Sequence, residues 1–381
     1  MKIAFLTPEY PHPKIKNAAG IGTSIFNLAS ELIRNKEHVT VFVYAQDKDE
    51  EFDDNGINIV KIALKKYRIL GWLLYRKHIE RIINTHIFKS KIELLEAPDW
   101  TGITAFMKLK CPIVIRLHGS DAYFCHLEQR KQKWKNYWFE KLGLKEADSI
   151  ISVSQFTAIK TKELFNIKSN IKIIHNGIDV EKFTRSERNL IEANSILYFG
   201  SIIRKKGVLE LASIFNEVIN NNPKASLTLV GKDVIDILEK KSTKILFKDK
   251  LTEEAKINIS FVEEVSYNEI QKYISKACVI VLPSFAEAFP MTWLEAMAMG
   301  KALVTSNIGW ATELMIDGNT GYIVSPINHK KYAQRIVELL DNSQLNKQFG
   351  ENAYIQIKEN FSKEIIYKKN IKYYKSIIGS K

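Results

Sequence analysis

Two carboxylates with a regular spacing are the clearest candidates for chemistry: Glu287 and Glu295, with seven residues between them. The apolar run Cys278–Leu282 predicts a buried strand, and Pro290 suits the first turn of a helix that ends near Gly300. Glu287 is therefore expected in a loop at a strand's carboxyl end, where doubly wound sheets bind ligands. There the two carboxylates could hold sugar and ribose hydroxyls, although Glu295 by itself could also be a solvated helix residue.

The elements that must position these residues alternate between short apolar strands and amphipathic helices along the whole chain. Unbroken apolar strands in such an alternation predict an α/β fold with parallel, doubly wound sheets. The predicted strands are Lys2–Thr7, Val39–Tyr44, Ile57–Ala63, Ile92–Leu95, Ile113–Leu117, Ser149–Val153, Ile171–Ile174, Ser195–Phe199, Ser226–Val230, Ile257–Phe261, Cys278–Leu282, Ala302–Thr305 and Gly321–Val324. A polar stretch over 181–194 interrupts the rhythm and is expected to connect two domains.

Five segments together carry a resemblance to a known family: AGIGTSIFNLASEL, RLHGSD, HNGIDVEKF, YFGSIIRKKG and PSFAEAFPMTWLEAMAMG. Their order resembles that of the retaining glycosyltransferases of GT-B fold, glycosyltransferase family 4 (glycosyl transferases group 1). The resemblance implies two Rossmann-like domains that face a central cleft. We expect an acceptor-side domain over 1–185, a nucleotide-sugar-binding domain over 186–361, and a C-terminal helix, about 362–381, that crosses back to the first domain.

The resemblance also implies roles for individual residues. Glu287 would hold the donor sugar, Lys206 would pair with the diphosphate, and His118 would lie beside the transferred sugar; these three are the expected catalytic residues. The expected donor-binding residues are Gly20, Gly22, Arg204, Lys206, Glu287, Ala288, Phe289, Pro290, Met291 and Glu295. Cations and helix-start amides would stabilise the negative charge that develops on the leaving nucleoside diphosphate.

The sequence departs from the family pattern at the phosphate loop. Ser201 stands where the family usually has Arg, so the second cation at the diphosphate is open, and Arg204 is the nearest substitute. His118 also allows a plain structural role in a loop. Asp47 and Asp49 have the D-x-D spacing of a metal site, but they lie in an acidic run expected to be a solvated loop. We therefore predict no essential metal and no cofactor besides the nucleotide-sugar co-substrate.

Composition and charge limit the cellular setting. Three separated cysteines give neither a disulfide framework nor a zinc pattern. No apolar run approaches the ~18 residues of a membrane span, and the N-terminus does not resemble a secretory signal. The expected location is the cytoplasm. The net charge of +13 suggests an anionic partner, although an AT-rich genome would also enrich Lys.

Two basic stretches with interleaved aromatic residues are candidates for contact with an anionic membrane. Residues 61–91 contain nine Lys or Arg and one acidic residue, and residues 130–145 contain Trp134 and Trp138. Such a composition suits the headgroup region of a membrane, which would place the protein on the inner face of the cell membrane with a lipid-linked acceptor. The alternative is that both stretches are ordinary amphipathic helices with their aromatic residues packed on the sheet.

The function expected from these features is transfer of a hexose from a UDP- or GDP-sugar to an acceptor hydroxyl with retention, in bacterial surface polysaccharide or glycolipid synthesis. The acceptor would be a carbohydrate or a lipid-linked sugar. One alternative is another GT-B enzyme, such as a sugar-nucleotide epimerase or a phosphorylase, because a fold does not define a reaction. A second is a basic nucleic-acid-binding protein, which would leave Glu287 and Glu295 without a role; we expect no nucleic acid.

Overall fold

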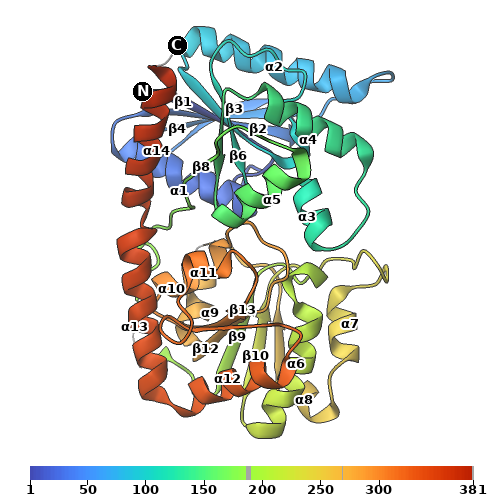
Figure 1. The fold of residues 1–381 in the computed structure, drawn as a ribbon, viewed down its shortest axis with the longest axis vertical. Coiled ribbons are helices and arrows are strands. Elements are labelled where there is room, and N and C mark those ends of the chain that lie inside the picture. Colours follow the sequence, from blue (N-terminus) through green and yellow to red (C-terminus); the bar gives the residue numbers. More distant parts are fainter. Residues whose placement is uncertain (186–189, 268, 380–381) are drawn as a thin grey trace. The chain divides into compact units, whose positions relative to one another are not determined.

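The computed structural model of the chain describes residues 1–185, 190–267 and 269–379. The chain divides into two compact units (Figure 1): Met1–Gly177 with Ser362–Lys381, here called unit 1, and Ile178–Phe361, here called unit 2. Within the expected connection at 181–194, residues 186–189 lie outside the described part of the chain.

Unit 1 is built on a sheet with the strand order β3-β4-β2-β1-β5-β6-β7-β8. Paired neighbours are parallel except β3 and β4, which are antiparallel. The expectation of a solvated loop over the acidic run 47–54 is therefore wrong for its second half, which forms edge strand β3. The strands are β1 (Lys2–Thr7), β2 (His38–Gln46), β3 (Glu50–Asp54), β4 (Ile57–Ala63), β5 (Leu94–Pro98), β6 (Ile113–Leu117), β7 (Ser149–Ser152) and β8 (Lys172–Ile173).

Helices cover both faces of this sheet because successive strand side chains point to opposite faces. On β1, Ile3 and Phe5 pack with α1 and α14, whereas Ala4 and Leu6 pack with α2, α4 and α5. The helical elements of unit 1 are α1 (Gly20–Arg34), α2 (Gly71–Ser90), η1 (Trp100–Gly102), α3 (Asp121–Leu127), α4 (Trp134–Glu146), α5 (Gln155–Phe165) and α14 (Lys363–Ile378).

Unit 2 has a second parallel sheet, with the strand order β11-β10-β9-β12-β13-β14. This is the Rossmann order 3-2-1-4-5-6, in which the direction of winding reverses between the first and fourth strands, here β9 and β12. The strands are β9 (Ser195–Phe199), β10 (Ser226–Val230), β11 (Ile259–Val262), β12 (Val279–Leu282), β13 (Ala302–Ser306) and β14 (Tyr322–Val324).

The second sheet is almost fully apolar, and every residue of β12 is buried. Such strands are expected when helices cover both faces of a sheet. The helical elements are η3 (Arg204–Lys206), α6 (Val208–Asn221), α7 (Thr243–Asp249), α8 (Glu253–Ile257), α9 (Ile270–Lys276), α10 (Met291–Ala298), α11 (Ala311–Leu314), α12 (His329–Asp341) and α13 (Ser343–Asn360). No helix among the described residues combines the length and the apolar character needed to cross a membrane.

Candidate functional site

Two loops of unit 2 are fastened together at the point where its winding reverses. The loop after β9 leads into η3, and the loop after β12 leads into α10. The amide of Phe285 donates to the carbonyl oxygen of Lys205 at 2.8 Å. Gly207 has a φ of +70°, and a Cβ there would lie 2.0 Å from the carbonyl oxygen of Pro283, so only glycine permits this approach. The two loops are therefore in direct backbone contact.

An ion pair joins the side chains of these loops. The Nζ of Lys206 lies 3.2 Å from Oε1 of Glu287, and both side chains are mostly buried. The hydroxyl of Ser284 donates to the same carboxylate oxygen at 3.3 Å. Gly200 has a φ of +129°, a backbone conformation that favours glycine, and it lies next to the lysine, since a Cβ there would be 3.4 Å from the Nζ. The Lys206 ammonium and the Glu287 carboxylate thus lie side by side at the reversal point of the sheet, where doubly wound sheets bind ligands.

Glu295 lies in α10 as expected, but it is buried rather than solvated, with 5% of its surface exposed. Burial raises the pKa of Glu295 to about 8, although the positive charges of Lys206 and Lys182 oppose the rise. Glu295 is therefore largely protonated at neutral pH and can donate as well as accept a hydrogen bond.

Arg204 forms ion pairs with two carboxylates of the loop after β10. Its guanidinium donates to both oxygens of Asp236, at 2.7 and 3.1 Å, and to Glu239 at 2.9 Å. Asp236 is fully buried, and the pair with Arg204 lowers the pKa of its carboxyl. In this arrangement Arg204 braces η3 against the loop after β10, and its charge is already compensated. Among the ion pairs of the described residues, Arg204 pairs with two carboxylates and Lys206 with one, so Lys206 is the better candidate for a diphosphate contact.

The segment Ala288–Met291 closes the loop and begins α10. Ala288, Phe289 and Met291 are each less than 8% exposed. Phe289 packs on Phe361 with ring centroids 5.6 Å apart. Pro290 occupies the N-cap position of α10, where no side chain caps the helix. These side chains are thus part of the core, and any contact with a donor would come from their backbone amides.

Gly20 and Gly22, both expected to bind the donor, are the first and third residues of α1 in unit 1. A Cβ on Gly22 would lie 2.8 Å from the carbonyl oxygen of Glu9, whereas a Cβ on Gly20 would meet nothing within 4 Å. The amide of Gly22 donates to the Glu9 carboxylate at 2.9 Å. Gly22 is therefore needed for close approach to the loop after β1.

His118 directly follows β6 at the carboxyl edge of the first sheet. Its amide donates to Oδ1 of Asp99 at 2.9 Å. Burial, with a smaller effect of the positive charge on Arg116, lowers the pKa of the His118 imidazole to about 3. The imidazole is therefore uncharged at neutral pH.

Asp99 and Ser284 were not singled out from the sequence. Asp99 directly follows β5, as His118 follows β6, but the strand predicted from the sequence ends at Leu95, so the position of Asp99 at a strand end could not be found there. Ser284 also follows an apolar strand, but serine is so common in turns that its type carries little information.

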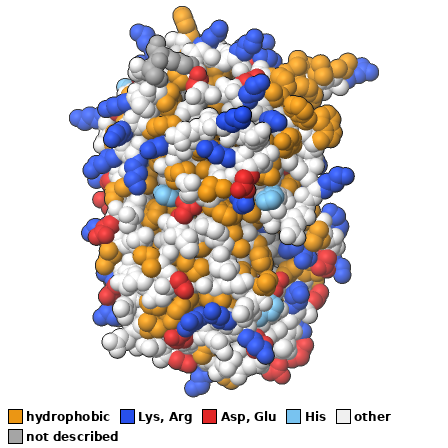
Figure 2. All heavy atoms as spheres, in the orientation of Figure 1, with side chains coloured by type: hydrophobic (Ala, Val, Ile, Leu, Met, Phe, Trp, Pro, Cys, Tyr) orange, Lys and Arg blue, Asp and Glu red, His pale blue; other side chains and the backbone are white. Residues whose placement is uncertain are grey.

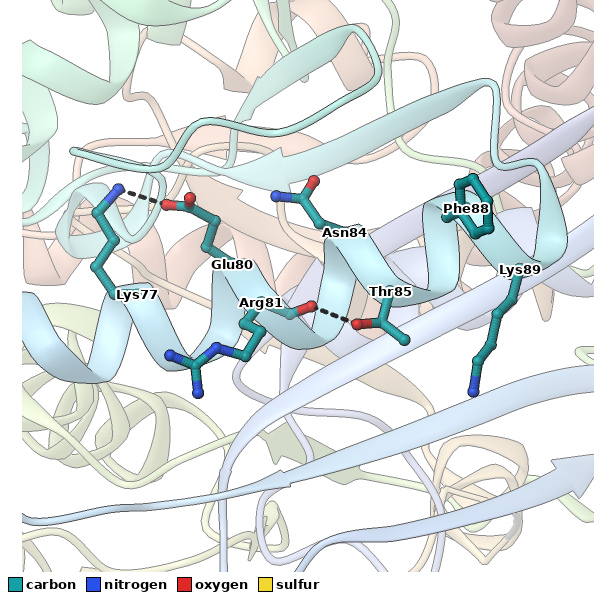
Figure 3. Close-up of a pocket in the computed structure, with 7 residues that line it drawn as sticks. All are labelled: Lys77, Glu80, Arg81, Asn84, Thr85, Phe88 and Lys89. Atoms are coloured by element: carbon teal, nitrogen blue, oxygen red, sulfur yellow. Dashed lines mark hydrogen bonds and ion pairs between the residues drawn. The ribbon is translucent and has the colours of Figure 1, made fainter.

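The structure thus brings Lys206, Glu287 and Glu295 together in unit 2, while Gly20, Gly22 and His118 belong to unit 1. A surface hollow along α2 contains none of the expected site residues (Figure 3). It is lined by Lys77, Glu80, Arg81, Asn84, Thr85, Phe88 and Lys89. The roles expected for the site residues remain predictions.

Two family models match consecutive parts of the chain. Residues 179–356 match the model described as "Glycosyl transferases group 1", and residues 18–182 match "Glycosyltransferase Family 4". An uncharacterized glycosyltransferase of Methanocaldococcus jannaschii is 27% identical over 97% of this chain and 95% of its own length. A capsular polysaccharide biosynthesis glycosyltransferase of Staphylococcus aureus is 27% identical over 61% of this chain and 62% of its own.

Solved structures show the same fold over the whole chain. Sucrose-phosphate synthase of Thermosynechococcus elongatus has a TM-score of 0.83 at 17% identity and covers 100% of both chains. HepE of Anabaena in complex with UDP has a TM-score of 0.73 at 19% identity, over 99% of this chain and 100% of its own. The expected fold class, α/β with two Rossmann-like parallel-sheet domains, is confirmed.

Proposed function

The chain belongs to the GT-B glycosyltransferases, and we propose that it transfers a hexose from a UDP- or GDP-sugar to an acceptor hydroxyl with retention of configuration. The observation that carries this proposal is the ion pair of Lys206 and Glu287, on two loops fastened at the reversal point of the second sheet. Lys206 would compensate the charge of the leaving diphosphate, and Glu287 would accept hydrogen bonds from the sugar hydroxyls.

The retaining course rests on the resemblance to the family. An oxygen of the donor's own phosphate would take the acceptor proton on the face that the leaving group vacates, so no protein nucleophile is needed. His118, uncharged at neutral pH, would accept or donate a hydrogen bond beside the transferred sugar. No metal is needed in this proposal because Lys206 and helix-start amides supply the positive electrostatic field.

Names of related proteins support the donor and the biological setting. One solved relative is described in complex with UDP-glucose, and another is described as involved in lipopolysaccharide biosynthesis. A sequence relative is described as a capsular polysaccharide glycosyltransferase. We therefore place the reaction in the synthesis of a surface polysaccharide or glycolipid, with a carbohydrate or lipid-linked acceptor.

The surface of unit 1 supports a peripheral place on the inner face of the cell membrane. Ile69 and Leu70, just before α2, are 72% and 54% exposed, and Trp134 and Trp138 of α4 are 69% and 51% exposed. Stacking of Trp72 on Phe139, at 4.9 Å, sets the start of α2 beside α4. Figure 2 shows hydrophobic atoms with Lys and Arg beside them at the upper right, where α2 begins in Figure 1.

Some aromatic residues of α4 pack inside unit 1, and others remain exposed for contact with a membrane. Tyr137 stacks on Phe165 within unit 1, as an ordinary amphipathic helix would require. Trp134 and Trp138 remain at the surface beside lysines, as an anionic headgroup region would require.

Sedimentation with vesicles tests the membrane part of the proposal. We expect binding to vesicles that contain phosphatidylglycerol and loss of binding in high salt or in Ile69→Glu. Ile257→Glu is the control, because Ile257 is 83% exposed but belongs to unit 2. Binding that ignores lipid charge and salt, or equal effects of the two variants, would contradict the proposal.

Glu287→Ala tests the enzymatic part. We expect this variant to lose sugar transfer but to keep most of its affinity for the nucleoside diphosphate, since the carboxylate would contact only the sugar. A thermal-shift panel of UDP, GDP and their sugars would identify the donor first. A fully active variant would refute the assignment, and oligonucleotide binding without donor turnover would favour the nucleic-acid-binding alternative.

A further inference from the structure

Asp99 lies at the point where the winding of the first sheet reverses. The strand order places β1 beside β5, and Asp99 directly follows β5. The neighbouring strand β6 runs parallel to β5, with Pro98 opposite Arg116, so residues after the two strands meet at one edge. This edge is the position at which doubly wound sheets bind ligands.

The carboxyl of Asp99 holds the turn that carries His118. Its Oδ1 accepts the amide of His118 at 2.9 Å, and the amide of Gly119 also donates to the carboxyl. Gly119 has a φ of +94°, and a Cβ there would lie 2.7 Å from the ring of Phe124. The turn is therefore restricted both by the close approach of Gly119 to Phe124 and by its hydrogen bond to Asp99.

The other oxygen of this carboxyl, Oδ2, is buried and has no hydrogen-bond partner among the described residues. Asp99 as a whole is 2% exposed. An ionised carboxylate with an unpaired, buried oxygen is costly, so these contacts favour the protonated form. In that form Oδ1 still accepts the amide of His118.

The charged groups around Asp99 do not all act in one direction. Glu140 favours the protonated form, whereas the positive charges of Arg76 and Arg116 favour the ionised form. Glu140 of α4 is buried, accepts the amides of Thr101 and Asp121, and adds negative charge near Asp99. Arg76 of α2 donates to the carbonyl oxygens of Thr101 and Gly102, and Arg116 of β6 lies near His118. Burial raises the pKa of Asp99 to about 8; the His118 amide opposes the rise and Glu140 adds to it.

We propose that Asp99 is a positioning residue for His118 that works in its uncharged form, fixing the His118–Gly119 turn without drawing a proton onto the imidazole. The proposal rests on the glycosyl transfer proposed above. A carboxylate beside His118 would favour the charged imidazolium. An uncharged imidazole keeps one nitrogen as acceptor and one as donor, which suits a sugar hydroxyl that must both donate and accept.

The rate of sugar transfer in Asp99→Asn and Asp99→Ala tests this proposal. Asparagine keeps the accepting oxygen of the turn and cannot ionise. We expect Asp99→Asn to stay within about threefold of wild type at pH 7, because wild-type Asp99 still carries its proton there. Asp99→Ala should lose on the order of 100-fold in kcat at every pH, because the His118 turn is misplaced. Asp341→Asn, an exposed carboxylate of unit 2, should behave as wild type.

A readout independent of catalysis keeps the proposal separate from the enzymatic assignment. In the full-length protein, the amide NMR signal of His118 should titrate with a midpoint near pH 8 in wild type and not in Asp99→Asn. Its imidazole should stay uncharged from pH 5 upward in both. Circular dichroism would establish that each variant is folded.

The outcomes are distinguishable. An Asp99→Asn variant that is folded but as inactive as Asp99→Ala, or a midpoint of the amide titration near pH 4, would overturn the role of uncharged Asp99. Absence of sugar transfer in the wild type with every donor and acceptor would overturn the proposed function, and the NMR titration would still decide the state of Asp99.

Discussion

Replacement of Glu295 by glutamine tests whether this buried carboxyl of unit 2 keeps its proton in the folded protein. Glu295 is 5% exposed, and burial raises its pKa from 4.5 to about 8 despite the opposing charges of Lys206 and Lys182. Between pH 4.5 and about pH 8, Glu295 keeps its proton in the folded protein but has released it in the unfolded chain. The free energy of unfolding must therefore fall as the pH rises through this window.

The size of the effect follows from the same two pKa values. At about 1.36 kcal/mol per pH unit, a rise from 4.5 to about 8 corresponds to at most about 5 kcal/mol. Glutamine cannot titrate, so Glu295→Gln should lose none of this stability. The variant and the wild type should differ little in pH dependence below pH 4.5 and diverge steadily up to pH 8.

Differential scanning calorimetry from pH 4 to pH 9 measures this divergence. We compare the melting temperature of unit 2 in Glu295→Gln with that in the wild type. The difference should grow in favour of the variant by on the order of 10 °C from pH 4.5 to about pH 8. Glu359→Gln is the matched control, because Glu359 is an exposed carboxylate of the same unit. Parallel pH profiles for wild type and Glu295→Gln would refute the reasoning and mean that Glu295 is ionised in the folded protein.

Three further variants test the loops and the core of the molecule. Lys206→Met should lower kcat of sugar transfer by about 10²–10³-fold, whereas Lys205→Met, with the same change of charge, should stay within about tenfold in steady-state assays. Gly207→Ala should destabilise unit 2 in thermal denaturation, because its Cβ would lie 2.0 Å from a carbonyl oxygen; Gly318→Ala, with the same φ of +70° but open space, should cost about 1–2 kcal/mol. Arg116 forms a buried ion pair with Glu96, and Arg116→Met would leave the Glu96 carboxylate without its cation. This variant should lower the free energy of unfolding of unit 1 in urea by about 3–5 kcal/mol, and a loss below about 1 kcal/mol would contradict the role of the Arg116–Glu96 pair.

Much of the fold could be predicted because its signals are local. Apolar strand runs such as Lys2–Thr7 and Ser195–Phe199 appear with the same bounds in the structure. The acidic strand β3 was missed because its residues Glu50–Asp54 have low strand propensity. That segment becomes a strand only through pairing with β4, a contact that no local pattern reports.

The candidate site was only partly readable from the chain. The strand run Cys278–Leu282 and the helix limits at Pro290 and Gly300 predicted Glu287 in a loop and Glu295 in a helix, and the structure agrees. The state of Glu295 was not readable, because burial depends on how α10 packs. The ion pair of Arg204 with Asp236 could not be predicted either, because Asp236 lies in a loop with no recognisable motif.

The sequence by itself determined most of the strands and helices, β3 excepted, and which residue types end those strands, because hydrophobic periodicity and turn chemistry act over a few residues. The tertiary structure decided which strand ends meet. Strand order brings Lys206 to Glu287 and Asp99 to His118, and burial at those edges decides which of the carboxyls keep their protons. Such pairings depend on contacts between distant segments and on exclusion of water, and neither is encoded in any short stretch of the chain.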